Sequence, residues 1–85
     1  MFEIKPRALS FLESLPVKDR RIVAEHIDRI ESKWPPAGDL ERLYGIRYRM
    51  HVSHRYTIFI EHEGKDTSIL QIMTIEQAHK RYGKI

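Results

Sequence analysis

Three basic or imidazole side chains recur at every second position between residues 47 and 52. They are Arg47, Arg49 and His51. A period of two is typical of a strand with one apolar face, so these side chains should project together from the other face. Histidine titrates near neutral pH and can accept or donate a proton, and arginine donates paired hydrogen bonds to phosphate oxygens. The segment therefore has the residue types for acid–base chemistry beside a phosphate.

A second apolar run, residues 56–60, predicts the partner strand of a β-hairpin. If residues 53–55 form a three-residue loop, Val52 lies opposite Tyr56 and the apolar side chains share one face. A two-residue loop would mix the faces, so we expect the longer one, although it contains no glycine to ease the turn. In this register the basic side chains of the first strand project together, and Arg55 stands beside them where the second strand begins.

These residue types permit metal-free cleavage of RNA, which carries its own nucleophile, the 2′-hydroxyl. The protein would supply a general base, donors to the charge on the phosphorane, and an acid for the 5′-oxygen. The simpler interpretation is a solvent-exposed sheet face, because strands often alternate apolar and charged residues. Against it, three cationic groups side by side repel one another unless an anion such as phosphate lies among them.

Composition indicates one small domain, residues 1–85, and the absence of cysteine excludes disulfides and thiolate metal sites. The net charge of +3 and the pI of about 9.4 favour an anionic partner without identifying it. No apolar run approaches the roughly 20 residues needed to cross a bilayer, and the first residues lack the apolar core of a signal peptide. The histidines show no metal-ligand spacing. We expect a soluble cytoplasmic protein with no metal, no small-molecule cofactor and no membrane partner.

The chain before residue 47 predicts a strand and two helices. Residues 2–5 alternate as in a short strand, and Pro6 suits the first turn of a helix. After Pro16 a second helix carries an apolar stripe at spacings of four and three. Its members are Val23, Ile27, Ile30 and Trp34. The prolines at positions 35 and 36 end this helix, and residues 40–44 lead into the hairpin.

The chain after the hairpin predicts a third strand of the series and a basic tail. Residues 67–75 are almost continuously apolar, which is typical of a central strand covered on both faces. Residues 76–85 have the length for a helical turn and bring further basic groups near the hairpin, unless they are an ordinary basic terminus. The expected order is β-α-α-β-β-β, an α+β fold with a helical hairpin packed on one face of a small antiparallel sheet.

The chain resembles the RelE/ParE toxin superfamily of type II toxin–antitoxin systems in this order of elements and in residues 40–64, which read LERLYGIRYRMHVSHRYTIFIEHEG. Residues 43–45 match the Leu-x-Gly segment of the family, and residues 48–52 match its Tyr-Arg-apolar-basic-Val strand. The next strand motif is transposed, at residues 55–59. The resemblance implies the RelE-like fold, which agrees with the order of elements derived above.

The resemblance also implies a function. RelE-like members are mRNA interferases that cleave mRNA in the ribosomal A site without metal and leave a 2′,3′-cyclic phosphate, and a RelB-like antitoxin is their cognate partner. ParE-like members instead inhibit DNA gyrase and lack the nuclease residues. A degenerate member would bind only its antitoxin. We expect the RelE-like endoribonuclease, with the ribosome and A-site mRNA as partners, and keep the other two as alternatives.

The family's functional positions carry over to two sets of residues in this chain. The catalytic candidates are His51, Arg49, Arg55, Arg81 and Tyr82. The candidates for contact with RNA or the ribosome are Arg47, His54, His79, Lys80 and Lys84. The first strand departs from the family, where lysines are usual. Because arginine stays protonated, His51 is the better general base, with Tyr82 or His79 as the acid. The basic cluster of the tail also comes later than in the family.

Overall fold

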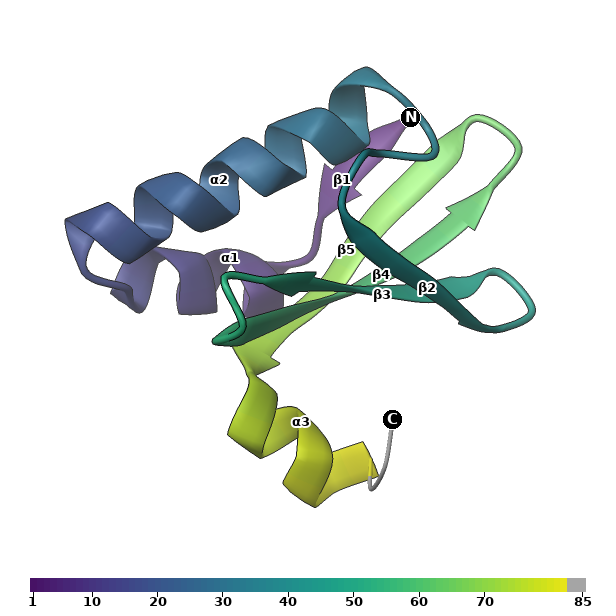
Figure 1. Cartoon of the computed structure of the whole chain (residues 1–85). Helices are drawn as coiled ribbons and strands as arrows, with labels where there is room; N and C mark the ends of the chain where they lie inside the picture. Colours follow the sequence, from purple (N-terminus) through teal and green to yellow (C-terminus); the bar gives the residue numbers. More distant parts are fainter. Residues whose placement is uncertain (83–85) are drawn as a thin grey trace.

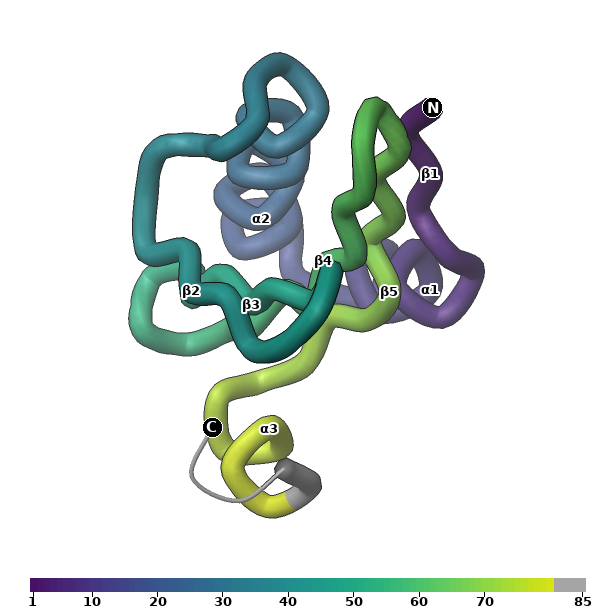
Figure 2. Tube along the Cα trace, turned by 90° about the vertical axis from the view of Figure 1, so that its right-hand side faces the viewer, coloured from purple at the N-terminus to yellow at the C-terminus, as the bar shows by residue number. Residues whose placement is uncertain are grey.

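The described chain forms a five-stranded sheet with two helices on one face and a third on the other (Figures 1 and 2). The computed structural model describes residues 1–82, with side chains as far as Lys80. The elements in chain order are β1 (Phe2–Ile4), α1 (Pro6–Ser14), α2 (Val17–Ser32), β2 (Asp39–Tyr44), β3 (Arg47–Val52), β4 (Tyr56–Glu63), β5 (Asp66–Thr74) and α3 (Ile75–Tyr82). None of the described helices is long and apolar enough to cross a membrane.

The sheet has the order β1-β5-β4-β3-β2, and its pairs are antiparallel except for the parallel pair of β1 and β5. The predicted α+β class and the helical hairpin on one face are confirmed. The prediction missed one strand, because residues 39–44 form β2 rather than a lead-in. The parallel pair arises because the chain leaves β1 through α1 and α2 and returns at the opposite edge of the sheet.

The main core lies between the sheet and the helical hairpin. The apolar stripe predicted for α2 is confirmed for Val23, Ile27 and Ile30, which are buried. Its fourth predicted member, Trp34, lies beyond the end of α2 at Ser32 and is half-buried against the same core. They meet the apolar side chains that the strands direct to the same face: Met50, Val52, Ile58, Ile60, Ile69 and Ile72. β4 is the central strand, and its residues 56–60 are all buried. The burial of these apolar side chains is the main contribution to the stability of so small a domain.

The β3–β4 hairpin has the predicted three-residue loop, with Val52 paired to Tyr56 and Met50 to Ile58. Ser53 and His54 both have φ of 54°, the left-handed conformation that favours glycine. The Arg55 amide donates to the Val52 carbonyl oxygen at 3.0 Å and closes the turn. The apolar pairing of the two strands therefore determines the loop length, although the loop residues themselves are poorly suited to the turn.

The tail forms a helix, α3, instead of the single turn that we expected. Thr74 and Gln77 form a capping box, in which the Gln77 amide donates to Thr74 Oγ1 and the Thr74 amide donates to Gln77 Oε1, both at 3.1 Å. Ala78 is buried against Phe59 and Met73, on the face of the sheet opposite the helical hairpin. A Thr-x-x-Gln sequence is a helix-start signal, so this helix was readable in the sequence.

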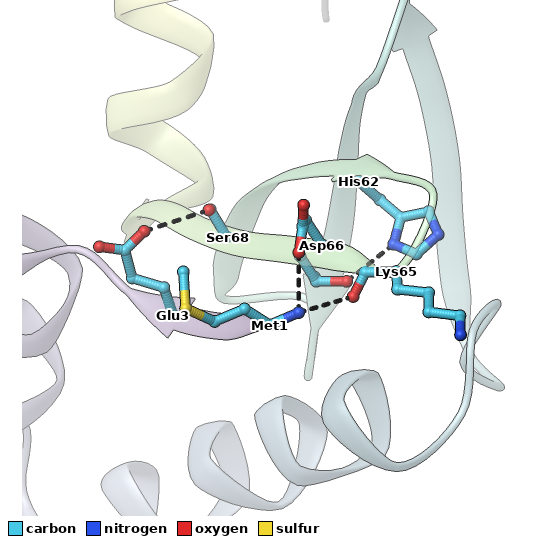
Figure 3. Close-up of polar contacts among 7 residues, drawn as sticks. Met1, Glu3, His62, Lys65, Asp66 and Ser68 are labelled. Carbon is cyan, nitrogen blue, oxygen red and sulfur yellow. Dashed lines mark hydrogen bonds and ion pairs between the residues drawn. The ribbon is translucent and has the colours of Figure 1, made fainter.

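The start of the chain is held at the β4–β5 turn (Figure 3). The Met1 amine donates to the Lys65 carbonyl oxygen at 3.0 Å and pairs with Asp66 Oδ1 at 2.8 Å. The hydrogen bond from this amine lowers the pKa of Asp66 below its usual value.

On β4, His62 Nδ1 lies 2.7 Å from Thr67 Oγ1, and the His62 ring stacks on the Trp34 ring with a centroid distance of 4.1 Å.

A hydrogen bond joins the sheet to the helical hairpin. The Tyr56 hydroxyl donates to Asp19 Oδ2 on α2 at 2.6 Å, and its ring packs edge-on against Phe11 of α1. The hydrogen bond to Asp19 and burial both raise the pKa of Tyr56 above its usual value. Below pH 10 the hydroxyl is protonated in the folded and the unfolded chain, so the bond stabilises the fold there and is lost as the pH rises through the folded-state pKa.

We predict that Tyr56→Phe lowers the free energy of unfolding by about 1–2 kcal/mol at pH 8, because the hydrogen bond is to a charged group. The difference in the free energy of unfolding between this variant and the natural chain should become smaller above pH 10, where tyrosine loses its proton. Urea unfolding at pH 8 and at pH 11 measures both effects. Tyr44→Phe is the matched control, since Tyr44 is exposed. Equal stability of natural chain and Tyr56→Phe at pH 8 would contradict the prediction.

Candidate functional site

Two of the predicted basic residues on β3 lie opposite carboxylates on β2. The strands pair His51 with Asp39 and Arg49 with Glu41. His51 Nδ1 is 3.3 Å from Asp39 Oδ2. Arg49 Nε donates to Glu41 Oε1 at 2.8 Å, and its Nη2 bonds to the same oxygen. Arg49 is only 13% exposed, so its guanidinium is held along the sheet surface by this pair.

The third basic residue on this face is paired in the same way. Arg47 lies opposite Glu61 on β4, with Nη2 3.3 Å from Glu61 Oε2. Each basic residue of β3 therefore has a carboxylate on the neighbouring strand, which is a stabilising arrangement on a sheet face. The mutual repulsion that the sequence implied is relieved within the described chain, and an external phosphate is not needed to explain it. We call these six residues the charge ladder: Asp39, Glu41, Arg47, Arg49, His51 and Glu61.

Arg55 does not join the charge ladder, so the expectation that it stands beside Arg49 and His51 is wrong. Its Nη1 lies 3.5 Å from Asp19 Oδ2 on α2, and its guanidinium lies 5.7 Å from the centre of the Tyr56 ring. α2 packs on the face opposite the charge ladder. The side chain is drawn there because Asp19 is the carboxylate that α2 presents at the start of β4.

The charge ladder borders a small apolar cluster under α3. Phe59 lies directly opposite Arg49, and Thr57 lies opposite His51, both on β4. Phe59 packs with Met73 and Ala78, so α3 covers the same face of the sheet as the ladder. Thr57 is fully buried, and its hydroxyl has no hydrogen-bond partner among the described residues. His51 therefore has an exposed carboxylate opposite it on β2 and a buried, unpaired hydroxyl opposite it on β4.

The remaining predicted residues are scattered. His54 is exposed in the hairpin turn, and His79 is exposed on α3. Lys80 lines a groove beside β5 together with Arg7. β5 is two strands from β3, a distance of about 10 Å at ordinary strand spacing, so Lys80 does not share a cavity with the ladder. The side chains of Arg81 and Tyr82, and the whole of Lys84, lie outside the part of the chain that the structure describes.

The acidic half of the charge ladder was missed in the sequence. Asp39, Leu40 and Glu41 alternate with a period of two, in step with the basic residues of β3. Gly45, which has φ of 54°, follows them as a turn signal. This pattern predicts a strand that pairs with β3 and supplies its counter-charges. In residues 1–80, whose side chains are described, we find no group of three or more potential metal ligands.

Comparison with known proteins identifies a similar fold. No protein-family model matches the sequence, and no curated protein matches it significantly. Among solved structures, the chain is similar to one in the crystal structure of the RelB–RelE antitoxin–toxin complex from Methanococcus jannaschii, with a TM-score of 0.76 over 93% of this chain and 96% of that chain. The two sequences are 17% identical. At this identity the likeness establishes the fold alone, and the fold is RelE-like.

We predict that removing the three carboxylates frees the basic half of the ladder for phosphates. The variant with Asp39→Asn, Glu41→Gln and Glu61→Gln should bind single-stranded RNA more tightly than the natural chain. Each phosphate contact on a single strand contributes about 0.7 to the slope of log affinity against log salt, so three new contacts should steepen it by about 2. Fluorescence anisotropy of a labelled oligonucleotide across a salt series measures this slope.

A matched control separates the ladder from net charge. Glu13→Gln, Glu25→Gln and Glu31→Gln change the net charge equally, but these exposed carboxylates lie on α1 and α2. If both triple variants gain the same affinity and slope, the ladder has no special part in RNA binding.

Proposed function

We propose that this chain is the toxin of a type II toxin–antitoxin system and acts as a RelE-like, ribosome-dependent mRNA endonuclease. The observation that carries the proposal is the pair of His51 and Asp39 beside Arg49 on a RelE-like sheet. A histidine held by a carboxylate is a common arrangement of a general base. The complex in which the similar chain occurs is named for an antitoxin and a toxin, which supports the coarser part of the proposal.

In this proposal His51 is the general base. Asp39 contacts Nδ1, which leaves Nε2 to remove the proton of the RNA 2′-hydroxyl. The 2′-oxygen then bonds to phosphorus, and the bond to the 5′-oxygen breaks. The products are a 2′,3′-cyclic phosphate and a 5′-hydroxyl. Neither step needs a metal or a cofactor. Tyr82, at the position of the family's tail tyrosine, or His79 would donate a proton to the 5′-oxygen.

Arg49 is the donor for the charge that develops on the phosphorane. Glu41 Oε1 accepts hydrogen bonds from both Nε and Nη2 of Arg49. A phosphate can replace this carboxylate, because Nε and Nη2 of an arginine donate two parallel hydrogen bonds to two phosphate oxygens. We propose that Glu41 orients Arg49 until RNA arrives, and that Arg47 contacts a neighbouring phosphate after leaving Glu61.

The partners in this proposal are the ribosome, mRNA in its A site, and a RelB-like antitoxin. A small basic toxin benefits from the ribosome because the ribosome supplies a fixed, single-stranded substrate and reduces the entropy cost of positioning it. The antitoxin would be a segment that folds as it binds and covers the basic face.

A second candidate is a non-enzymatic member that inhibits DNA gyrase or only binds an antitoxin. The charge ladder favours it, because both arginines of β3 are already paired with carboxylates and His51 lies beside a third. Phosphates must displace these carboxylates before RNA can bind. A protein-binding inhibitor would keep the ladder as a structural feature.

We predict that the natural chain cleaves mRNA at A-site codons in a reconstituted translation reaction, mapped by primer extension. Cleavage should disappear when ribosomes are omitted. His51→Ala should reduce the cleavage rate by about 100- to 10,000-fold, the usual contribution of a general base. His26→Gln is the control, since His26 lies on α2 and its Nδ1 contacts the Ile22 carbonyl. Thermal unfolding of each variant checks that the fold is kept.

One outcome would reject the nuclease, and another would reject only the assignment of its general base. Intact mRNA with a folded natural chain would favour the second candidate, and a supercoiling assay with purified DNA gyrase would then separate an inhibitor from an antitoxin-binding relic. Full cleavage by a folded His51→Ala variant would remove His51 from the mechanism and leave the general base unassigned.

A further inference from the structure

Half of β5 has an open edge. β1 pairs only with residues 67–69 of β5, and the chain then turns into α1. The Lys5 amide makes the last bond of this pair, to the Ile69 carbonyl oxygen at 2.9 Å. Residues 70–74 have β4 on one side and, in the part of the chain that is described, no strand on the other. An edge of this kind is a template for another strand.

The backbone groups at this edge can be assigned from two hydrogen bonds. The Ile75 amide donates to the carbonyl oxygen of Arg55, the residue just before β4, whereas the Thr74 amide donates to the side chain of Gln77. Successive strand residues direct their N–H and C=O groups to opposite edges. Ile72, two residues before Thr74, therefore directs both groups away from β4, and Met73 directs its groups towards it.

A groove of about 710 Å³ lies along this open edge. α1 forms one wall with Arg7, Ser10 and Phe11, and α3 forms the other with Gln77 and Lys80. Phe11 and Ile72 give the groove apolar surface on the side of the helical hairpin, and Met73 does so on the side of α3. The groove therefore offers apolar contact to both faces of a strand that lies in it.

The two rims of the groove carry cations without counter-charges. Arg7 on α1 and Lys80 on α3 are exposed, and neither forms an ion pair with any described residue. Both arginines of β3 are paired with carboxylates, whereas Arg7 and Lys80 are available to an anion. An acidic occupant would satisfy them. A second copy of this chain would instead bring four cations together.

We propose that this groove binds an extended, acidic and apolar segment of another polypeptide, which adds to β5 as a sixth strand. Recognition by strand addition takes affinity from the backbone and specificity from side-chain contacts. Each face of the added strand meets one apolar wall and one cation, so the segment needs valine-like residues flanked by acidic ones on both faces. The identification of this segment with the proposed antitoxin rests on the proposed function. The groove and the chemistry of the segment that fits it are independent of that function.

The probe is a blocked, fluorescein-labelled hexapeptide, Glu-Glu-Val-Val-Glu-Glu, which presents one valine and two glutamates on each face of a strand. We expect saturable binding by fluorescence anisotropy, and at least tenfold weaker binding by the variant with Arg7→Glu and Lys80→Glu. Lys18→Glu with Arg21→Glu is the matched control, because it changes the net charge equally on α2, away from the groove. The same peptide with lysine for glutamate should bind the Arg7/Lys80 variant in preference to the natural chain.

Amide exchange tests the strand addition itself. Bound peptide should slow hydrogen exchange at Ile72, whose amide faces the open edge, and leave Met73, whose amide faces β4, unchanged. A peptide methylated on alternate backbone nitrogens should lose this protection. Equal binding by the two charge variants, unchanged exchange at Ile72, or displacement of the peptide by single-stranded RNA would each overturn the proposal. The peptide-binding and exchange experiments need no ribosome. A negative result in them therefore says nothing about the nuclease, and the absence of mRNA cleavage says nothing about peptide binding.

Discussion

The pairing register of β3 is the constraint on which the rest of the structure depends. One face of this strand supplies Met50 and Val52 to the core, and the other presents Arg49 and His51. A shift of one residue would bury the charges and expose the core side chains. The loss of this burial outweighs the cost of two left-handed residues in the turn, which is why a loop without glycine is tolerated. The register fixes the core and the candidate site together.

The same register decides how the charges are balanced. β2 and β4 flank β3 and place carboxylates directly opposite its cations, so the basic row becomes a ladder of ion pairs. Exposed pairs of this kind contribute little to stability, but they hold Arg49 and His51 in fixed positions beside each other. For RNA the ladder acts in two ways. It orients Arg49 and His51 for the proposed cleavage. It also places carboxylates on the two arginines, which a phosphate must displace before it can bind.

The topology of the sheet explains why one edge is left open. β1 is only three residues long because Pro6 starts α1 immediately after it. α1 then crosses beside β5 and cannot also pair with it. On the other face, the capping box at Thr74 and Gln77 turns the chain into α3 at the end of β5. The two helices become the walls of a groove whose floor is an unpaired strand edge, so the groove follows directly from the order of the elements.

The sequence by itself determined the class of the fold, the apolar stripe of α2 and the loop of the central hairpin. Each follows from local periodicity, because burial of one face requires a regular spacing of apolar residues. The capping box of α3 and the alternation of Asp39 and Glu41 are local sequence signals of the same kind. Only the tertiary structure decided which charges meet. Arg55 turns to Asp19 of α2, and Lys80 lies across a groove from Arg7. Long side chains contact counter-charges and surfaces that distant elements contribute. The local spacing of residues carries no information about which distant elements lie close together.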